Sequence, residues 1–304
     1  MRHFLSVADL STDEIAAVLD HAGRLKGQPW LAHLPRPLAA ALLFERPSLR
    51  TRTAYEVALM HLGGRAINLE TRLGEREAVA DVARTLSQLV ALIVARVRDH
   101  SSLDALVGHA EVPVVNALSD REHPVEVLAD ALTLRDVWGE LRGHRLTYVG
   151  AGNNICHSLL LLAPLAGMDI TVASPAGYTP AAGIIQQARE LARRHGTGLE
   201  IVSEPRDAVR GADAVYTDVW ASMGGEDSAE QRRRIFQPYQ VNDELLSLAK
   251  ADAIVLHCLP ARRGEEISAA VLEGPRSMAF HRLSNLVPAT TALLHRLLTH
   301  PATA

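Results

Sequence analysis

Cysteine, aromatic residues and long apolar runs are all scarce in this chain of 304 residues. Its two cysteines, Cys156 and Cys258, stand far apart and in no metal-ligand spacing, which argues against a disulfide framework and fits a reducing compartment. Aromatic residues make up only 4%, so the cores must be built from leucine, valine, alanine and isoleucine. The longest apolar stretch, residues 159–168, is well short of the ~20 residues that cross a bilayer, and residues 1–10 lack the apolar core of a secretory signal. We therefore expect a cytoplasmic protein that does not enter a membrane.

A strong charge of either sign is also absent. Lysine and arginine number 31 against 35 aspartate and glutamate residues, and no basic block of the kind that follows a nucleic-acid backbone occurs. No nucleic-acid partner is therefore expected. Hydrophobic residues make up 48% and charged residues 22%, which is the balance of a soluble globular protein, and the length suggests two domains.

Short apolar segments alternate with longer segments of helical periodicity along the whole chain. This alternation predicts an α/β protein with two doubly wound parallel-sheet domains joined by interdomain helices. The expected strands are residues 38–44, 66–69, 91–95 and 112–117 in the first half, and residues 145–149, 170–173, 199–202, 214–217 and 254–258 in the second.

The boundary between the two domains is expected at residues 139–144, after a strong helical pattern over residues 123–138. The first domain then covers residues 1–138 and the second covers residues 139–287. A C-terminal helix over residues 288–304 is assigned to the first domain, and it begins with proline, which suits the first helical position. Near the start of the chain, Ser11 and Glu14 have the spacing of a capping box for a helix over residues 12–26.

Residues 44–56, which read FERPSLRTRTAYE, form the most informative segment. They follow an expected buried strand and open a helix, and the N–H groups and dipole of a helix N-terminus favour anions. The same turn adds the hydroxyls of Ser48 and Thr51 and the guanidinium groups of Arg50 and Arg52, a set that suits a phosphate. Spacing alone leaves an N-capped helix with surface arginines equally open.

Five segments in order resemble motifs of the aspartate/ornithine carbamoyltransferase family, and of its ornithine branch in particular. Residues 48–52 (SLRTR) resemble the carbamoyl-phosphate loop STRTR, and residues 123–130 (HPVEVLAD) resemble the helix HPxQxLAD. Residues 150–158 (GAGNNICHS) resemble GDGNNxxHS, while residues 218–224 (DVWASMG) and 257–260 (HCLP) are similar to the signatures that separate ornithine from aspartate enzymes. The resemblance implies carbamoyl transfer from carbamoyl phosphate to the side-chain amine of ornithine or a close analogue, without metal or cofactor, in a homotrimer.

The resemblance also implies a set of carbamoyl-phosphate ligands. They are Ser48, Leu49, Arg50, Thr51, Arg96, His123 and Glu126. Arg96 and His123 are expected to be catalytic, because each would donate to the carbamoyl oxygen as it gains negative charge. Leu49 stands where the family has threonine and would act through its backbone N–H. For His123 taken alone, a helix-capping or core role is the commoner alternative.

A second implied set binds the amino acid. It comprises Asn154, Asp218, Ser222, Met223, Cys258 and Leu259. Asp218 would pair with the α-ammonium group, while Cys258 and the Leu259 carbonyl would align the side-chain amine, so Cys258 is expected to be catalytic. An inert buried thiol is the alternative for Cys258. The glycines of residues 150–154 also leave a dinucleotide-binding turn open, although the third glycine and the acidic residue after the next strand are missing.

Two positions change the charge of the expected donor site. Glu126 replaces a glutamine that donates to the carbamoyl group, and Leu286 replaces an arginine that contacts carbamoyl phosphate. Two like charges ~4 Å apart repel by about 4 kcal/mol at an effective dielectric of roughly 20, so we expect Glu126 to be protonated or neutralised by Arg96 or Arg50. Arg282 is a candidate replacement for the missing arginine. A divergent member with another donor or acceptor, or with a non-catalytic amino-acid-binding role, stands as the alternative.

Overall fold

The structure is a computed structural model that describes residues 3–220 and 229–299. The chain divides into two compact units, of which unit 1 comprises Met1–Leu132 and Ser284–Ala304, and unit 2 comprises Thr133–Leu283. Each unit contains one parallel sheet, of four strands in unit 1 and five in unit 2. The predicted α/β class with two parallel sheets is therefore confirmed, and all nine expected strands are present with bounds within two residues of the prediction.

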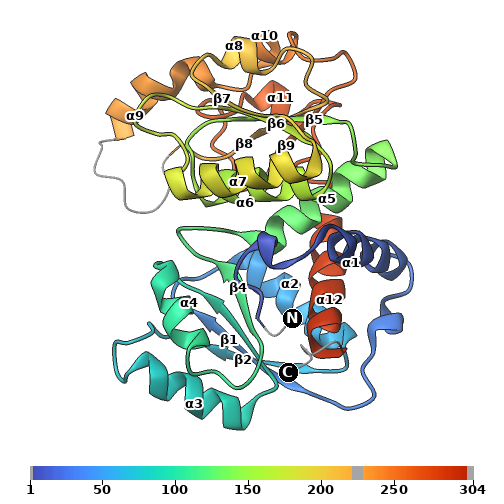
Figure 1. Cartoon of the computed structure of the whole chain (residues 1–304), viewed down its shortest axis with the longest axis vertical. Coiled ribbons are helices and arrows are strands. Elements are labelled where there is room, and N and C mark those ends of the chain that lie inside the picture. The colour runs from blue at the N-terminus through green and yellow to red at the C-terminus, as the bar shows by residue number, and fades with distance from the viewer. Residues whose placement is uncertain (1–2, 221–228, 300–304) are drawn as a thin grey trace. The chain divides into compact units, whose positions relative to one another are not determined.

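The sheet of unit 1 has helices on both of its faces. Its strands are β1 (Ala39–Phe44), β2 (Arg65–Leu69), β3 (Leu92–Arg96) and β4 (Val114–Leu118), in the order β2-β1-β3-β4. The helices assigned wholly or mainly to this unit are α1 (Thr12–Leu25), α2 (Leu49–His61), α3 (Val79–Leu89), α4 (His100–Val107) and α12 (Leu283–Thr299), with short turns η1 (Val7–Asp9) and η2 (Pro29–Ala32). Figure 1 shows α3 and α4 on one side of the sheet and α1, α2 and α12 on the other. Because both faces are covered, β1 is an almost continuous apolar run.

Unit 2 repeats this plan with a longer sheet. Its strands are β5 (Arg145–Val149), β6 (Asp169–Ala173), β7 (Leu199–Val202), β8 (Ala214–Thr217) and β9 (Ile254–His257), in the order β7-β6-β5-β8-β9. Its helices are α6 (Asn154–Leu165), α7 (Ala182–His195), α8 (Pro205–Ala208), α9 (Ala229–Phe236), α10 (Asp243–Leu246) and α11 (Ala269–Glu273), with the turn η3 (Gln237–Tyr239). In Figure 1, α6 and α7 lie on one face of the sheet, while α8, α10 and α11 lie on the other. The switch in strand order beside β5 places the ends of β5, β8 and β9 together.

Local sequence signals explain where several helices begin. Ser11 caps α1, since its hydroxyl accepts from the Glu14 N–H at 3.2 Å and the Glu14 carboxylate accepts from the Ser11 N–H at 2.9 Å. The predicted capping box is therefore confirmed. Helix α5 (Pro124–Trp138) begins with proline at its first position, where no N–H is needed, and continues beyond Leu132 into unit 2.

The predicted start of the last helix at Pro288 is wrong. Helix α12 begins at Leu283 and contains Pro288 in its interior. Proline removes one helical hydrogen bond, but the helix is held by a buried stripe that includes Leu286, Leu293 and Leu297. Tertiary packing therefore outweighs the local preference of proline for the first turn.

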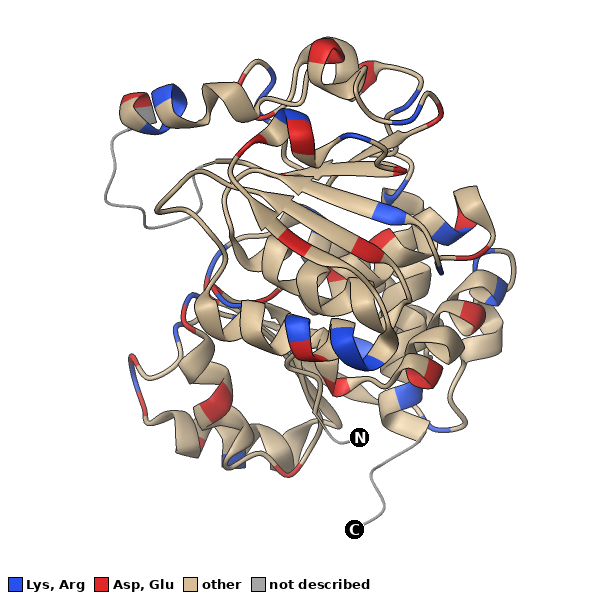
Figure 2. Cartoon of the chain, turned by 45° about the horizontal axis from the view of Figure 1, so that its top comes forward, with Lys and Arg blue, Asp and Glu red and all other residues tan. Residues whose placement is uncertain are grey.

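Charged residues of both signs are interspersed along the helices and loops in the view of Figure 2, while the strands carry few of them. No helix among residues 3–220 and 229–299 is both long enough and apolar enough to cross a membrane.

Candidate functional site

A guanidinium group and two hydroxyls converge where α2 begins. Ser48 precedes α2, but its side chain makes no capping hydrogen bond to the helix. Instead, Arg96 Nη1 donates to Ser48 Oγ at 3.2 Å and to Thr51 Oγ1 at 3.1 Å. The pairing of Phe44 with Arg96 in the β1–β3 register sets the end of β3 beside the turn that follows β1. The structure thus brings together three of the residues predicted to bind carbamoyl phosphate.

The other residues of this turn point in different directions. The Leu49 side chain is 78% exposed, so the polar group that Leu49 offers to the turn is its backbone N–H. Arg50 is half-buried. Arg52 is engaged elsewhere. Its Nη2 donates to Glu70 Oε1 at 2.7 Å, and its guanidinium carbon lies 5.5 Å from the centre of the Phe44 ring.

His123 and Glu126 form a buried pair at the start of α5. His123 precedes Pro124, and Glu126 lies in the first turn, so the two side chains share one face of the chain. His123 Nε2 lies 3.3 Å from Glu126 Oε2. We expected protonation, Arg96 or Arg50 to neutralise Glu126, and the structure adds His123 as a partner. The spacing of three residues was the signal that could have predicted it.

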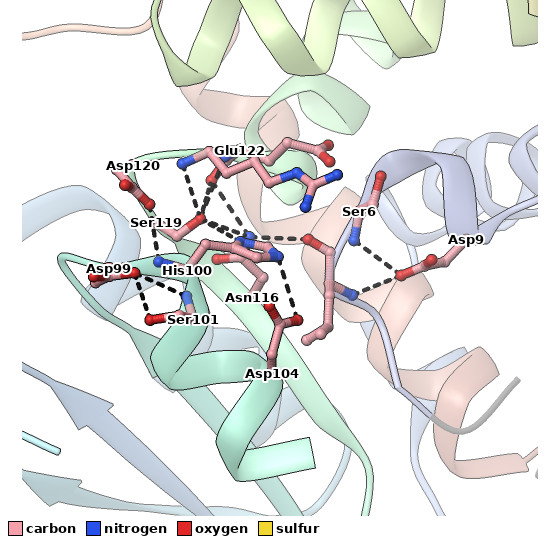
Figure 3. Close-up of polar contacts among 12 residues, drawn as sticks. Ser6, Asp9, Asp99, His100, Ser101, Asp104, Asn116, Ser119, Asp120 and Glu122 are labelled. Carbon is pink, nitrogen blue, oxygen red and sulfur yellow. Dashed lines mark hydrogen bonds and ion pairs between the residues drawn. The ribbon is translucent and has the colours of Figure 1, made fainter. Parts of the chain in front are cut away.

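The loop before His123 is held by a network of polar contacts, drawn in Figure 3. His100 Nδ1 and Ser119 Oγ are 2.8 Å apart, and the Ser119 N–H donates to the Glu122 carbonyl at 2.9 Å. The Glu122 carboxylate in turn accepts from the Val7 N–H at 3.2 Å. Burial lowers the pKa of His100, which favours the neutral imidazole. These contacts, which sequence reasoning missed, fix the backbone that presents His123.

In unit 2, the carboxylate of Asp218 is held by two neutral donors. Asp218 follows β8 and Cys258 follows the neighbouring strand β9. Asn153 Nδ2 donates to Asp218 Oδ2 at 2.6 Å, and Cys258 Sγ donates to Asp218 Oδ1 at 3.0 Å. Asn153 Oδ1 accepts from the Cys156 N–H at 3.1 Å as the cap of α6, which sets the orientation of the amide. Neither donor carries charge, so the negative charge of Asp218 is available to a cationic ligand.

Sequence reasoning chose Asn154 and missed its neighbour Asn153. Asn154 is the first residue of α6, and its Oδ1 accepts from the Ile155 N–H at 2.9 Å. The missed signal is the preference for asparagine at the residue before a helix, which applies to Asn153. Ser222 and Met223, which were also predicted to bind the amino acid, lie outside the described residues.

The glycine-rich turn after β5 is required by packing. A Cβ atom added to Gly152 would lie 2.1 Å from the backbone nitrogen of Pro180. The Gly152 N–H also donates to the Tyr178 carbonyl at 2.7 Å. Close approach of two backbone segments therefore explains this glycine without a dinucleotide.

The segment after β9 has an unusual backbone. Leu259 has a φ of 60°, which non-glycine residues seldom adopt and which clusters at functional sites. Its N–H donates to His257 Nδ1 at 2.8 Å, so His257 carries its proton on Nε2 and donates to Glu266 Oε1 at 3.0 Å. Arg282 Nη1 lies 3.4 Å from the Cys258 carbonyl oxygen. The Cys258–Leu259 backbone is thus fixed by a buried histidine, and its carbonyl group faces a buried arginine.

Arg282 was a candidate replacement for an arginine at position 286. Arg282 contacts the Cys258 carbonyl within unit 2, beside residues that were predicted to bind the amino acid, and its role as a replacement stays a prediction. Leu286 packs in unit 1 against Ala54, Ala129 and Ala289. No charge is therefore contributed at position 286 itself.

Two family models match nearly the whole chain. The model described as "Aspartate/ornithine carbamoyltransferase, carbamoyl-P binding domain" matches residues 2–136. The model described as "Aspartate/ornithine carbamoyltransferase, Asp/Orn binding domain" matches residues 142–297. The chain belongs to the aspartate/ornithine carbamoyltransferase family.

Individual relatives place the chain near the ornithine enzymes of this carbamoyltransferase family. An ornithine carbamoyltransferase from Acidothermus cellulolyticus is 50% identical over 302 residues, covering 98% of this chain and 97% of that protein. One from Thermus thermophilus is 45% identical over 300 residues, covering 98% and 97%. The solved structure of ornithine carbamoyltransferase from Pyrococcus furiosus has a TM-score of 0.94 at 41% identity, covering 99% of this chain and 98% of that one. The family expected from five short motifs is thus confirmed.

The polar groups divide between the two carbamoyltransferase family models. Arg96, Ser48, Thr51 and the His123–Glu126 pair fall within the carbamoyl-P binding match. Asn153, Asp218, Cys258 and Arg282 fall within the Asp/Orn binding match.

One group of side chains in this carbamoyltransferase has the composition of a metal site. Within the described residues, ligand atoms of Asp218, His257 and Cys258 lie within 4.8 Å of one another. Both ring nitrogens of His257 are already used, however, and the Cys258 thiol donates to Asp218. The three side chains therefore fit a hydrogen-bonded cluster better than a metal centre, and the absence of a metal cofactor stays a prediction.

Proposed function

We propose that this carbamoyltransferase transfers the carbamoyl group of carbamoyl phosphate to the side-chain amine of ornithine, giving citrulline and phosphate. The amine nitrogen attacks the carbamoyl carbon, the bond from that carbon to the phosphate oxygen breaks, and the amine passes one proton to the leaving phosphate. Phosphate leaves with the bonding electron pair. The observation that carries the proposal is the convergence of Arg96 with the Ser48 and Thr51 hydroxyls at the start of α2.

The donor half of the reaction is assigned to unit 1. Ser48, Arg50, Thr51 and the Leu49 N–H bind the phosphate, where the helix N-terminus adds its own partial positive charge. Arg96 bridges the phosphate and the carbamoyl oxygen. His123 donates to that oxygen, and the two donors lower the barrier because its negative charge grows in the transition state. Glu126 lies beside the carbamoyl group and orients His123.

The acceptor half is assigned to unit 2. Asp218 pairs with the α-ammonium group of ornithine, and Asn154 binds the same end of the molecule. Ser222 and Met223 are assigned to the binding of the same substrate. Cys258 and the Leu259 carbonyl hold the side-chain amine, and the left-handed backbone of Leu259 orients its carbonyl for this contact. Positioning accounts for this half of the catalysis, because a neutral amine needs no further activation once it is aligned.

The direct test supplies millimolar ornithine and carbamoyl phosphate and measures citrulline and phosphate together. The proposal predicts equal amounts of the two products above the rate without protein, and little product from lysine or putrescine in place of ornithine. A wild-type protein that forms no citrulline would reject the proposal. In that case the alternative of a divergent binding protein predicts that ornithine raises the melting temperature while carbamoyl phosphate does not.

A cytoplasmic homotrimer that serves arginine metabolism is part of the same proposal. The resemblance to the family supports the trimer, and the two cysteines, which are buried and form no disulfide with each other, are consistent with a reducing compartment. Light scattering of the purified protein should give three times the mass of one chain. A monomer at micromolar concentration would contradict the trimer and leave the reaction untouched.

A further inference from the structure

One buried hydroxyl near the donor turn has no role in the reaction as described so far. Tyr55 lies on α2 and is 1% exposed. Its hydroxyl makes no hydrogen bond to any residue that the structure describes. Buried hydroxyl groups in native proteins are nearly always hydrogen-bonded, because an unmet donor costs free energy. The Tyr55 hydroxyl is therefore a donor with unused capacity in the interior of unit 1.

The position of Tyr55 links the phosphate turn to the His123–Glu126 pair. Tyr55 follows Thr51 by one helical turn, so both project from the same face of α2. Burial raises the pKa of Tyr55 far above its usual value, and the nearby charge of Glu126 raises it further. The Tyr55 phenol therefore keeps its proton at neutral pH, and the negative charge of Glu126 acts on it.

Helix packing brings the neighbours of Tyr55 and Glu126 into one cluster. Ala54 of α2, Ala129 of α5, and Leu286 and Ala289 of α12 form one buried cluster. Ala54 adjoins Tyr55, and Ala129 follows Glu126 by three residues on the same face of α5. Small residues of α2 and α5 therefore pack into the same buried cluster, together with α12. Position 286 supplies leucine, so the cluster brings no cation to Glu126.

Glu126 and the carbamoyl oxygen compete for the same histidine. His123 Nε2 lies 3.3 Å from the Glu126 carboxylate, and a single N–H cannot be fully directed at two acceptors. A bound dianion also repels Glu126 more strongly in a buried site than in water. A second donor to Glu126 would relieve both problems.

We propose that Tyr55 is a positioning residue of the donor site, whose hydroxyl donates to the Glu126 carboxylate when carbamoyl phosphate binds and so releases His123 to the carbamoyl oxygen. This inference rests on the proposed function. Tyr55 itself touches neither substrate.

The test compares Tyr55→Phe in two backgrounds. In the wild type, the substitution removes one oxygen, and the KM for carbamoyl phosphate should rise about tenfold with a lower kcat, because a charge-assisted hydrogen bond is lost. The KM for ornithine should stay within about twofold, as the acceptor groups are unaltered. In Glu126→Gln protein, the same substitution should change the KM for carbamoyl phosphate by less than about threefold, because no carboxylate remains to be held.

Melting temperature distinguishes this role from a structural one. Tyr55→Phe should leave the melting temperature of the ligand-free protein unchanged or higher, because it removes an unmet donor. The matched control is Tyr239→Phe, whose hydroxyl donates to the Ser203 carbonyl, and it should lower the melting temperature without changing either KM. An unchanged KM in Tyr55→Phe, or an equal KM change in both backgrounds, would overturn the inference.

The same comparison can be made without turnover, by measuring how much carbamoyl phosphate alone raises the melting temperature. This rise should be smaller for Tyr55→Phe than for the wild type, and the difference should vanish in the Glu126→Gln background. A wild-type shift with no citrulline formed would reject the proposed reaction and leave the Tyr55 inference standing. Equal shifts for both proteins would reject the inference and leave the reaction standing.

Discussion

The two units differ in how a buried carboxylate is surrounded, at Glu126 in unit 1 and at Asp218 in unit 2. In unit 2, Asp218 accepts from an amide and a thiol, so its charge is preserved for the ammonium group of a ligand. In unit 1, the carboxylate of Glu126 lies beside His123, in the site that we propose for a doubly charged anion. The proposed amino-acid site therefore keeps a carboxylate for its cationic ligand. In the proposed carbamoyl-phosphate site, the Glu126 carboxylate competes with the anionic ligand for the same positively charged and hydrogen-bond-donating side chains. Removing the carboxylate should therefore lower activity at Asp218 and raise it at Glu126.

The largest effect is expected from Arg96. Arg96→Gln removes the guanidinium group that joins Ser48 and Thr51, and kcat/KM should fall by about a thousandfold, as for loss of a principal charge-stabilising donor. Citrulline formation under saturating ornithine measures the loss, and the melting temperature checks that the protein is folded. A fall of less than about tenfold would show that another positively charged group supplies most of the charge stabilisation in the carbamoyl-phosphate site.

Asp218 should show the next largest effect, on the other substrate. Asp218→Asn keeps the size of the side chain but removes the charge, so the KM for ornithine should rise by about a hundredfold. Binding of carbamoyl phosphate to unit 1 should be unaltered, and calorimetry of that ligand is the control. Equal losses for both ligands would mean that the substitution has disturbed the fold rather than one contact.

A gain of activity is expected when the donor site is restored. Glu126→Gln together with Leu286→Arg removes a negative charge and adds a positive one, and the KM for carbamoyl phosphate should fall by about tenfold. Glu126→Asp with Leu286→Arg is the matched control, because it retains the carboxylate. An unchanged or higher KM in the glutamine protein would show that Glu126 does not oppose the anion.

The smallest effect concerns stability near neutral pH. Burial lowers the pKa of His100 below its usual 6.5, so the unfolded chain binds the proton more readily than the folded one. The stability that His100 contributes is therefore present above pH 6.5 and is lost as the pH falls below it. Burial also lowers the pKa of His21, as do the nearby His295 and Arg24, and this has the same sign.

Unit 2 should respond only to stronger acid. Burial acts to raise the pKa of Asp213, but hydrogen bonds from Lys250 and the Arg145 N–H hold it below its usual 3.8, so its contribution is lost only as the pH falls below that value. Amide hydrogen exchange at about pH 7.5 and about pH 5.5 should show added opening in unit 1 alone, with a fall in melting temperature of about 2 °C. His100→Gln should reduce this difference. Equal opening of both units would contradict the assignment.

The positions of the strands and the start of α1 could be predicted from local sequence patterns, while the contacts within the site could not. The apolar run of β1 and the Ser11–Glu14 spacing each have a local cause, namely burial on both faces and a cap. The contact of Asn153 with Asp218 joins residues 65 positions apart, and it depends on β5 and β8 being neighbours in the sheet. No local pattern reports strand order.

Two features of unit 1 show which contacts a local sequence pattern can predict and which it cannot. The His123–Glu126 pair was readable, because three residues on a helix place side chains together. The influence of the Glu126 charge on Tyr55 was not, because it depends on how Ala54 of α2 and Ala129 of α5 come together in one buried cluster. Proline at position 288 was misread for the same reason, since packing of α12 overrides its local preference.

Calorimetric titration of the wild-type protein with carbamoyl phosphate, in the absence of ornithine, tests the central claim most directly. The account predicts one binding site per chain, with an affinity that Asp218→Asn leaves unchanged and Arg96→Gln abolishes. No heat of binding in the wild type, or binding that survives Arg96→Gln, would contradict the assignment of the α2 turn as the donor site.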